Sequence, residues 1–185
     1  MNEQNQRFIC NELLELVVQA TLQRSPTYAE KASAKRKGEF REGLRRQLET
    51  IANQYSGKVS EDKHIENIRR LSDELRKNFS DCLVNGRFRI GSAQKALNLH
   101  LKYLWRLGRI STPPHCPFDF FVINKLSLDS PISWTKLDDI EGYKELVEDA
   151  KRKANGVSLA EWEYEEYEKE REKARERARS QNSTS

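Results

Sequence analysis

The amino-acid sequence predicts an all-α protein of about seven helices, and three observations support this fold class. Apolar residues recur at helical spacing along most of the chain. No segment alternates apolar and polar residues between two turns, as a half-buried β-strand would. The 185 residues are 34% charged and 36% hydrophobic, which suits one modest core. We expect one helical domain at 1–157, a charged helix at 158–180 and a disordered tail at 181–185.

The first three predicted helices are amphipathic. The first covers 3–23 and the second covers 27–55, each with one apolar face. The third begins after Ser60, whose hydroxyl can cap the free N–H groups of the first turn, and its apolar stripe ends at Cys82. His64 lies outside this stripe, so we expect it to be exposed.

The central predicted helix, 92–107, differs from the others because it is apolar almost all round. We expect Ser92 to cap it and Gly108 to end it. A helix of this kind is expected to be buried, so its few polar residues need hydrogen-bond partners. His100 is therefore interpreted as a hydrogen-bonded core histidine. The main apolar face consists of Ala93, Ala96, Leu97, Leu101 and Leu104.

Three further helices are expected after a proline-rich turn at 113–117. Asp119 is placed to cap a short helix at 120–126. A sequence resembling a capping box at Thr135 predicts a helix that continues to about Asn155. Ser158 and Glu161 form a second such pattern and open the charged last helix.

Composition excludes several classes of protein. The three cysteines are far apart and odd in number, so they do not form a disulfide framework, and we expect a reducing, cytoplasmic location. No apolar run reaches the ~18 residues of a membrane helix. The sequence has no glycine-rich phosphate loop, no CxxC pair and no HExxH, and its three histidines are dispersed. We therefore expect no metal and no cofactor.

Positive charge is concentrated at 31–46, the densest basic run of the chain. Such a run is either a solvated helix face or a surface that contacts phosphates, and the sequence leaves both interpretations open. The net charge of +4 is too small to establish a nucleic-acid partner by itself.

One constellation of residues carries a resemblance to a known family. Gly91 begins the pattern Gly-x-x-x-Lys-Ala-Leu-Asn-Leu, an apolar helix follows, and Pro-His-Cys-Pro-Phe-Asp ends at Asp119. This order, over 86–126, resembles the helix-hairpin-helix DNA glycosylase superfamily. The resemblance implies an all-α fold in which Lys95 attacks the sugar C1′ and Asp119 assists loss of the base. It also implies that a glycine hairpin, here including Gly91, binds DNA phosphate through backbone N–H groups.

The first hypothesis is therefore a helical DNA-binding protein with glycosylase or abasic-site lyase chemistry on damaged or modified DNA. The residues expected to contact DNA are Arg87, Arg89, Gly91, Lys102, Arg106 and Arg109. The residues expected to stack on an extruded base are drawn from Tyr103, Trp105, Phe118 and Phe120.

Two alternatives remain open. In the first, the chain is a non-catalytic helical interaction protein whose C-terminal helix docks a partner or a second copy. In the second, the chain is a helical domain of a phage-defence or toxin system with nuclease chemistry. Arg109 and His115 have the spacing found in some helical ribonucleases, although the prolines between them disfavour a shared helix. The substrate base, the oligomeric state and the pathway are not determined by the sequence.

Overall fold

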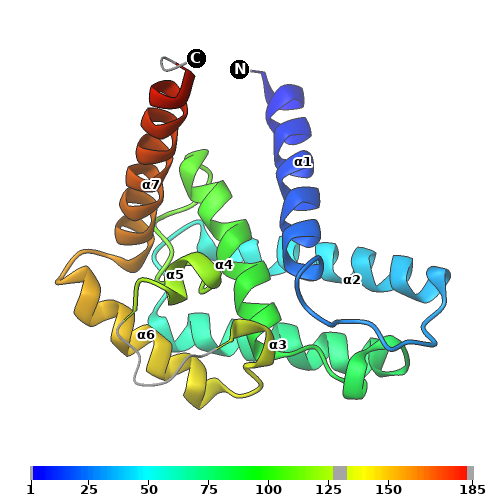
Figure 1. Ribbon diagram of the computed structural model, residues 1–185. Helices are drawn as coiled ribbons and strands as arrows, with labels where there is room; N and C mark the ends of the chain where they lie inside the picture. Colours follow the sequence, from blue (N-terminus) through cyan, green and yellow to red (C-terminus); the bar gives the residue numbers. More distant parts are fainter. Residues whose placement is uncertain (1, 127–132, 183–185) are drawn as a thin grey trace.

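The structure, a computed structural model, describes residues 2–126 and 133–182 and confirms the all-α fold class over them. This part of the chain contains seven α-helices and several single 3-10 turns, and no strand (Figure 1). None of its helices has the length and apolarity needed to cross a membrane. The helices are α1 (Glu3–Leu22), α2 (Ala34–Ala52), α3 (Glu61–Phe79), α4 (Ile90–Arg106), α5 (Phe120–Ile123), α6 (Ile140–Ala154) and α7 (Leu159–Asn182).

Helix α4 is the centre of the fold. It contacts α1, α2, α3 and α6, and it lies between α1 and α7 (Figure 1). Burial is nearly complete from Ile90 to Leu101, as expected for a helix that is apolar all round. Beyond Leu101 the expectation fails, since Leu104 is half-buried and Leu107 is exposed. The C-terminal turns of α4 line surface cavities.

Helices α2 and α3 pack closely through aromatic side chains. The Phe40 ring makes edge contacts with Phe79 and Phe88 at centroid distances of 5.5 and 5.4 Å. Gly43 lies directly under the Phe79 ring, where a Cβ atom would approach a ring carbon to 2.7 Å. Any larger residue at this position would displace the Phe79 ring, so the glycine permits this close packing, even though glycine weakens the interior of a helix.

The second helix begins later than the sequence predicts. Ser33 is its N-cap, so 27–33 precede the helix. The backbone of this segment pairs with the chain that follows α3. Ala29 N–H donates to the carbonyl of Cys82, and Val84 N–H donates to the carbonyl of Thr27. These long-range hydrogen bonds satisfy the backbone groups that a helix would otherwise use.

Two predicted caps are also wrong. Helix α4 begins at Ile90, two residues before Ser92. The hydroxyl of Ser92 is buried, 3.0 Å from the hydroxyl of Ser25 on the loop after α1. Helix α6 begins after Asp139, which accepts a hydrogen bond from Gly142 N–H at 2.7 Å. The predicted start at Thr135 is instead a 3-10 turn, Trp134–Lys136.

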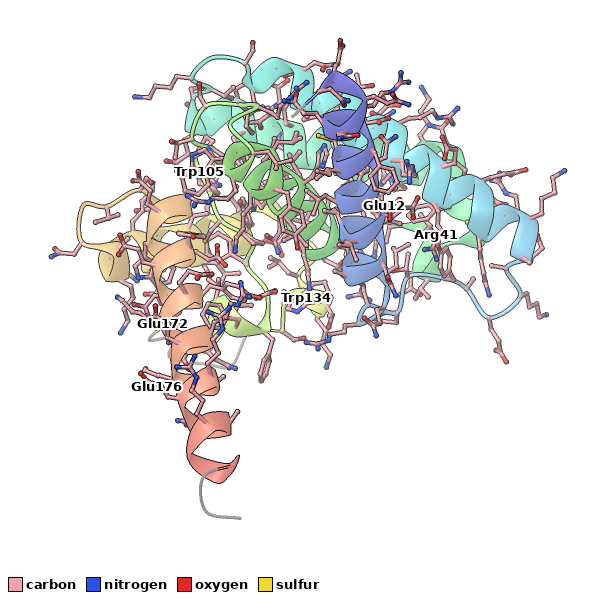
Figure 2. All side chains as sticks on the ribbon, turned by 90° about the horizontal axis from the view of Figure 1, so that it is seen from above. Glu12, Arg41, Trp105, Trp134, Glu172 and Glu176 are labelled. Carbon is pink, nitrogen blue, oxygen red and sulfur yellow. The ribbon has the colours of Figure 1, made fainter. Side chains whose placement is uncertain are left out.

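The start of α7 is as predicted. Ser158 caps the helix, because its hydroxyl accepts from Glu161 N–H. The Glu161 carboxylate accepts from the same hydroxyl rather than from the Ser158 backbone N–H of a full capping box. The first turns of α7 pack against the domain, whereas its C-terminal part, with Glu172 and Glu176, projects beyond the other helices (Figure 2). Within the tail predicted at 181–185, the helix continues to Asn182, and 183–185 lie outside the described residues.

Candidate functional site

The structure brings Lys95 and Asp119 together. Lys95 lies in the second turn of α4, and its Nζ is 3.7 Å from Oδ2 of Asp119. Asp119 caps α5 as predicted, because its carboxylate accepts hydrogen bonds from the N–H groups of Phe121 and Val122. The Lys95 side chain is 7% exposed and the Asp119 side chain 32% exposed. Both line a cavity of about 530 Å³ between α4 and α7.

The surroundings of Lys95 favour its neutral form. Burial lowers the pKa of Lys95 below 10.5, the positive charge of Arg24 lowers it further, and Asp119 opposes both effects. The Lys95 Nζ also lies 4.4 Å from the centre of the Trp134 ring, whose face, like the carboxylate, attracts the charged form. Burial outweighs these attractions, so the pKa is lowered on balance. A larger fraction of Lys95 is therefore free amine than for an exposed lysine at the same pH.

Gln94 holds the two segments that carry this pair. Its Nε2 donates to the carbonyl of Phe118 at 2.7 Å, and its Oε1 accepts from the N–H of Phe118 at 3.1 Å. Gln94 directly precedes Lys95, and Phe118 directly precedes Asp119. We call this arrangement the Gln94 clasp. Because both backbone groups of Phe118 are engaged, the clasp sets the position of Asp119 relative to Lys95.

A buried polar network continues from the clasp. Asn98 Nδ2 donates to Gln94 Oε1 and to the Tyr143 hydroxyl, at 3.3 and 3.2 Å. With that hydroxyl as acceptor from Asn98, its own proton goes to His115 Nδ1, at 2.7 Å. Asn98 Oδ1 accepts from His64 Nε2 at 2.8 Å. The network therefore joins α3, α4, α6 and the proline-rich turn.

The expectation that His64 is exposed is wrong. His64 is fully buried, and both of its ring nitrogens are hydrogen-bonded. Besides the bond from Nε2 to Asn98, the Tyr55 hydroxyl lies 2.8 Å from Nδ1. Burial lowers the pKa of His64 well below 6.5, and the nearby His115 lowers it further. Burial also lowers the pKa of His115, whose ring centroid is 4.7 Å from that of His64. Both histidines are consequently neutral, with the proton on Nε2.

The rest of the cavity wall is aromatic and ion-paired. Lys102 Nζ and Glu163 Oε1 are 2.7 Å apart, with side-chain exposures of 13% and 4%. The Arg106 guanidinium lies 3.9 Å from the centre of the Tyr164 ring. The aromatic residues that line the cavity are Tyr103, Phe121, Tyr164 and Tyr167.

The arginines predicted to contact DNA do not form one patch. Arg87 and Arg89 both reach Oδ2 of Asp138, at 3.2 and 3.3 Å, near the start of α4. Arg109, beyond the other end of α4, donates to Gln6 and lines a second cavity of about 350 Å³. Of the predicted set, only Lys102 and Arg106 share the cavity with Lys95. In Figure 2, Trp134 marks the start of α4, near Arg87 and Arg89, and Trp105 marks its other end, near Arg109, so the length of the helix separates the two groups of arginines.

Gly91 has a different role from the expected one. Its N–H donates to the carbonyl of Leu137 at 2.9 Å, so it is not available to a phosphate. A Cβ atom at this position would lie 1.7 Å from the carbonyl oxygen of Trp134. Gly91 therefore permits the loop that carries Trp134 to reach α4. The N–H of Gly86 is also engaged, with the carbonyl of Leu83 at 3.0 Å.

Part of the basic run at 31–46 is neutralised within the fold. Arg36 pairs with Asp81 and with Glu39, at 2.5 and 2.6 Å. Arg45 pairs with Glu15 of α1. These pairs favour a solvated helix face for this part of the run.

The described residues contain no group of three or more His, Cys, Asp or Glu side chains that could hold a metal ion. Cys116 is fully buried, and burial raises the pKa of its thiol well above the ordinary value. A thiolate nucleophile at this position is therefore disfavoured.

Sequence reasoning missed three residues of the site: Gln94, Trp134 and Glu163. A signal existed for Gln94, because a polar residue on a helix that is apolar all round must have a partner. Glu163 resembled the other glutamates of α7, and only its spacing from the apolar Leu159 and Ala160 indicated the inner face.

The fold and the site define a helical protein in which a buried lysine pairs with a half-buried aspartate in an aromatic-lined cavity. Comparisons with protein-family models, with curated proteins and with solved structures found no match.

Proposed function

We propose that the protein binds DNA and acts on damaged or modified bases as a glycosylase or abasic-site lyase, with Lys95 as nucleophile. The observation that carries the proposal is the pair formed by Lys95 and Asp119 at 3.7 Å in one cavity. These are the residues that the resemblance to the helix-hairpin-helix glycosylases assigns to the nucleophile and the carboxylate.

The proposed reaction can be written with Lys95, Asp119 and the DNA substrate alone. In glycosylase chemistry, the neutral Nζ of Lys95 bonds to the sugar C1′ while the bond from C1′ to the base breaks. The base leaves with the electron pair and takes up a proton. On an abasic sugar, Nζ adds to the C1′ aldehyde and water leaves, which forms a Schiff base. In both cases the carboxylate of Asp119 stabilises the positive charge that develops at the sugar.

The cavity suits a base extruded from the duplex. Its volume is about 530 Å³, and its aromatic side chains offer flat faces for stacking. Of the four residues expected to stack, Tyr103 lines the cavity, and Trp105 is not among the lining residues. Phe118 is fully buried, and Phe120 is exposed outside the cavity. The stacking role is therefore proposed for Tyr103, together with Phe121 and Tyr167.

Schiff-base trapping tests the proposal. Borohydride reduction of a mixture of protein and an abasic duplex converts a Schiff base into a stable covalent adduct. We expect an adduct with the wild-type chain and none with Lys95→Ala, while Lys125→Ala, a lysine paired with Glu166 on α7, serves as the matched control. Melting temperatures of both variants establish that they fold. An equal adduct yield from Lys95→Ala refutes the role of Lys95.

DNA binding is tested separately. Because lysine and arginine contacts to phosphate release counterions, affinity for any duplex should fall steeply with salt. Arg87 is 47% exposed near the start of α4, and Arg87→Glu should weaken binding irrespective of sequence. Absence of binding at low salt removes the nucleic-acid function altogether.

A second candidate function is that of a non-catalytic interaction protein. The observation that favours it is the projecting part of α7, in which residues 171–179 are all exposed (Figure 2). This segment would dock a partner or a second copy of the chain. Sedimentation equilibrium of the full chain and of a chain ending at Lys169 tests docking between copies. If the full chain is an oligomer and the shortened chain a monomer, docking through α7 is supported. If both are monomers, docking between copies is opposed.

A further inference from the structure

The Lys102–Glu163 pair has no evident stabilising purpose. It joins α4 to α7 at the wall of the cavity that holds Lys95 and Asp119. Both side chains are nearly buried, and the desolvation of such a pair offsets much of its attraction. An apolar pair would fill the same space at lower cost, so the ion pair is better explained by what it can bind.

Glu163 has an unused acceptor. Its Oε1 accepts from Lys102, whereas its Oε2 is buried and has no hydrogen-bond partner among the described residues. A buried carboxylate oxygen without a partner is costly, and native structures rarely tolerate it without a reason. An N–H donor from a bound molecule would satisfy this atom.

The surroundings of the pair fit a flat ring. The Lys102 Nζ lies 4.7 Å from the centre of the Tyr167 ring, and Phe121 makes an edge contact with Tyr167 at 5.8 Å. Tyr103 and Tyr164 also line the cavity. Aromatic side chains of this kind stack on any base, so stacking alone would hold the ring without selecting it. The polar pair would then determine which base binds.

We infer that Lys102 and Glu163 form a subsite for the edge of a guanine-type base, that is, a 2-amino-6-oxopurine. This edge presents a carbonyl, a ring N–H and an amino group in a row. Lys102 donates to the carbonyl, and the two oxygens of Glu163 accept from the ring N–H and the amino group. Because Oε2 exposes less than 1 Å² of surface, this pairing requires the carboxylate to rotate until Oε2 faces the base.

Other bases match the subsite less well. Hypoxanthine lacks the amino group, so Oε2 stays unpaired. Adenine offers one amino group beside a ring nitrogen that only accepts, so one oxygen of Glu163 stays unpaired. A site that leaves a buried polar atom without its partner rejects such analogues strongly. The inference rests on the proposed function, because the base reaches the cavity by extrusion from DNA.

Calorimetric titration of the full chain with nucleosides tests the subsite. We expect 2′-deoxyguanosine to bind about tenfold more tightly than 2′-deoxyadenosine, with 2′-deoxyinosine between them. Glu163→Gln should remove this preference. Glu168→Gln is the matched control, because Glu168 lies on the same helix, lines the same cavity and loses the same charge. Melting temperatures report whether each variant folds, and the comparison of nucleosides on the wild type needs no variant.

The outcomes separate this inference from the proposed function. Equal affinities for the three nucleosides, or no binding at millimolar nucleoside, overturn the subsite. If Lys95-dependent trapping is nevertheless observed, the proposed function stands and only the guanine preference is wrong. If guanine is preferred and the preference persists in Lys95→Ala, while no adduct forms with the wild type, the subsite stands and the catalytic proposal is wrong.

Discussion

Loss of the hydrogen bonds of the Gln94 clasp should lower the free energy of unfolding by several kcal/mol, although only one side chain is changed. Gln94 makes four hydrogen bonds, to Gly91, to both backbone groups of Phe118 and to Asn98. The variant Gln94→Met keeps the length of the side chain but leaves the N–H and the carbonyl of Phe118 buried without partners. Each unsatisfied group costs about 1–3 kcal/mol, so the expected loss of unfolding free energy is roughly 2–6 kcal/mol.

Leu101→Met is the matched control, since Leu101 is fully buried on the same helix and makes only apolar contacts through its side chain. A volume-conserving change of this kind should cost less than about 1.5 kcal/mol. Urea denaturation measures both free energies, and hydrogen exchange at the Phe118 amide reports the local effect of losing the clasp. If Gln94→Met is as stable as the control and the Phe118 amide remains protected, the clasp does not hold the turn.

Two further predictions concern the core and its histidines. Leu101→Ala should lower the free energy of unfolding by about 2–5 kcal/mol, and Leu104→Ala by less, because Leu104 is only half-buried; equal losses in urea denaturation would contradict this difference. Stability should also fall as the pH drops below 6.5. Burial lowers the pKa values of His64, His100 and His115 in the folded protein, that of His100 to about 4. Below pH 6.5 the unfolded chain therefore binds protons at these histidines that the folded chain does not bind. Each histidine contributes up to about 1.4 kcal/mol per pH unit, and a melting temperature that is flat between about pH 7 and pH 5 would contradict the neutral histidines.

The spacing of apolar residues predicted the helices, because each helix buries an apolar stripe. The same spacing gave wrong predictions of burial for polar residues. On α3 the stripe from Ile65 to Phe79 is buried as expected. His64 falls outside it, yet Tyr55 and Asn98 cover the histidine with hydrogen-bond partners from distant segments. A buried polar residue does not contribute to apolar periodicity, so its burial is determined by partners that the local sequence does not contain.

The starts of helices were predictable only where the cap is local. Ser60 and Ser158 cap helices as expected, because hydroxyl and backbone N–H lie three residues apart in the chain. The residues at 27–33 have apolar spacing compatible with a helix, but their backbone pairs with the chain near Cys82. Competition from a distant segment decides that choice, and a local pattern has no information about it.

The pairing of Lys95 with Asp119 could be expected from the resemblance, whereas the means of holding them together could not. The clasp requires that Gln94 meet the backbone of Phe118, which depends on how the proline-rich turn passes α4. The loop that brings Trp134 against Lys95 likewise depends on Gly91, whose missing Cβ makes room for a carbonyl. A glycine near the start of a helix is compatible with phosphate binding and with close packing, so its sequence position does not distinguish the two roles.

Two faces of helix α4 differ in character: one lies in the apolar core and the other borders the cavity between α4 and α7. One face, with Ala93, Leu97 and Leu101, is fully buried in the apolar core. The face toward α7 instead places Lys95 and Lys102 in the cavity wall, each beside an acidic partner. Buried ion pairs contribute little net stability, and this applies most clearly to Lys102 and Glu163, whose side chains are 13% and 4% exposed. The face of α4 toward α7 thus carries two charged pairs beside this cavity, whereas the face toward the core carries apolar residues. This division supports the proposal that a polar ligand binds between α4 and α7.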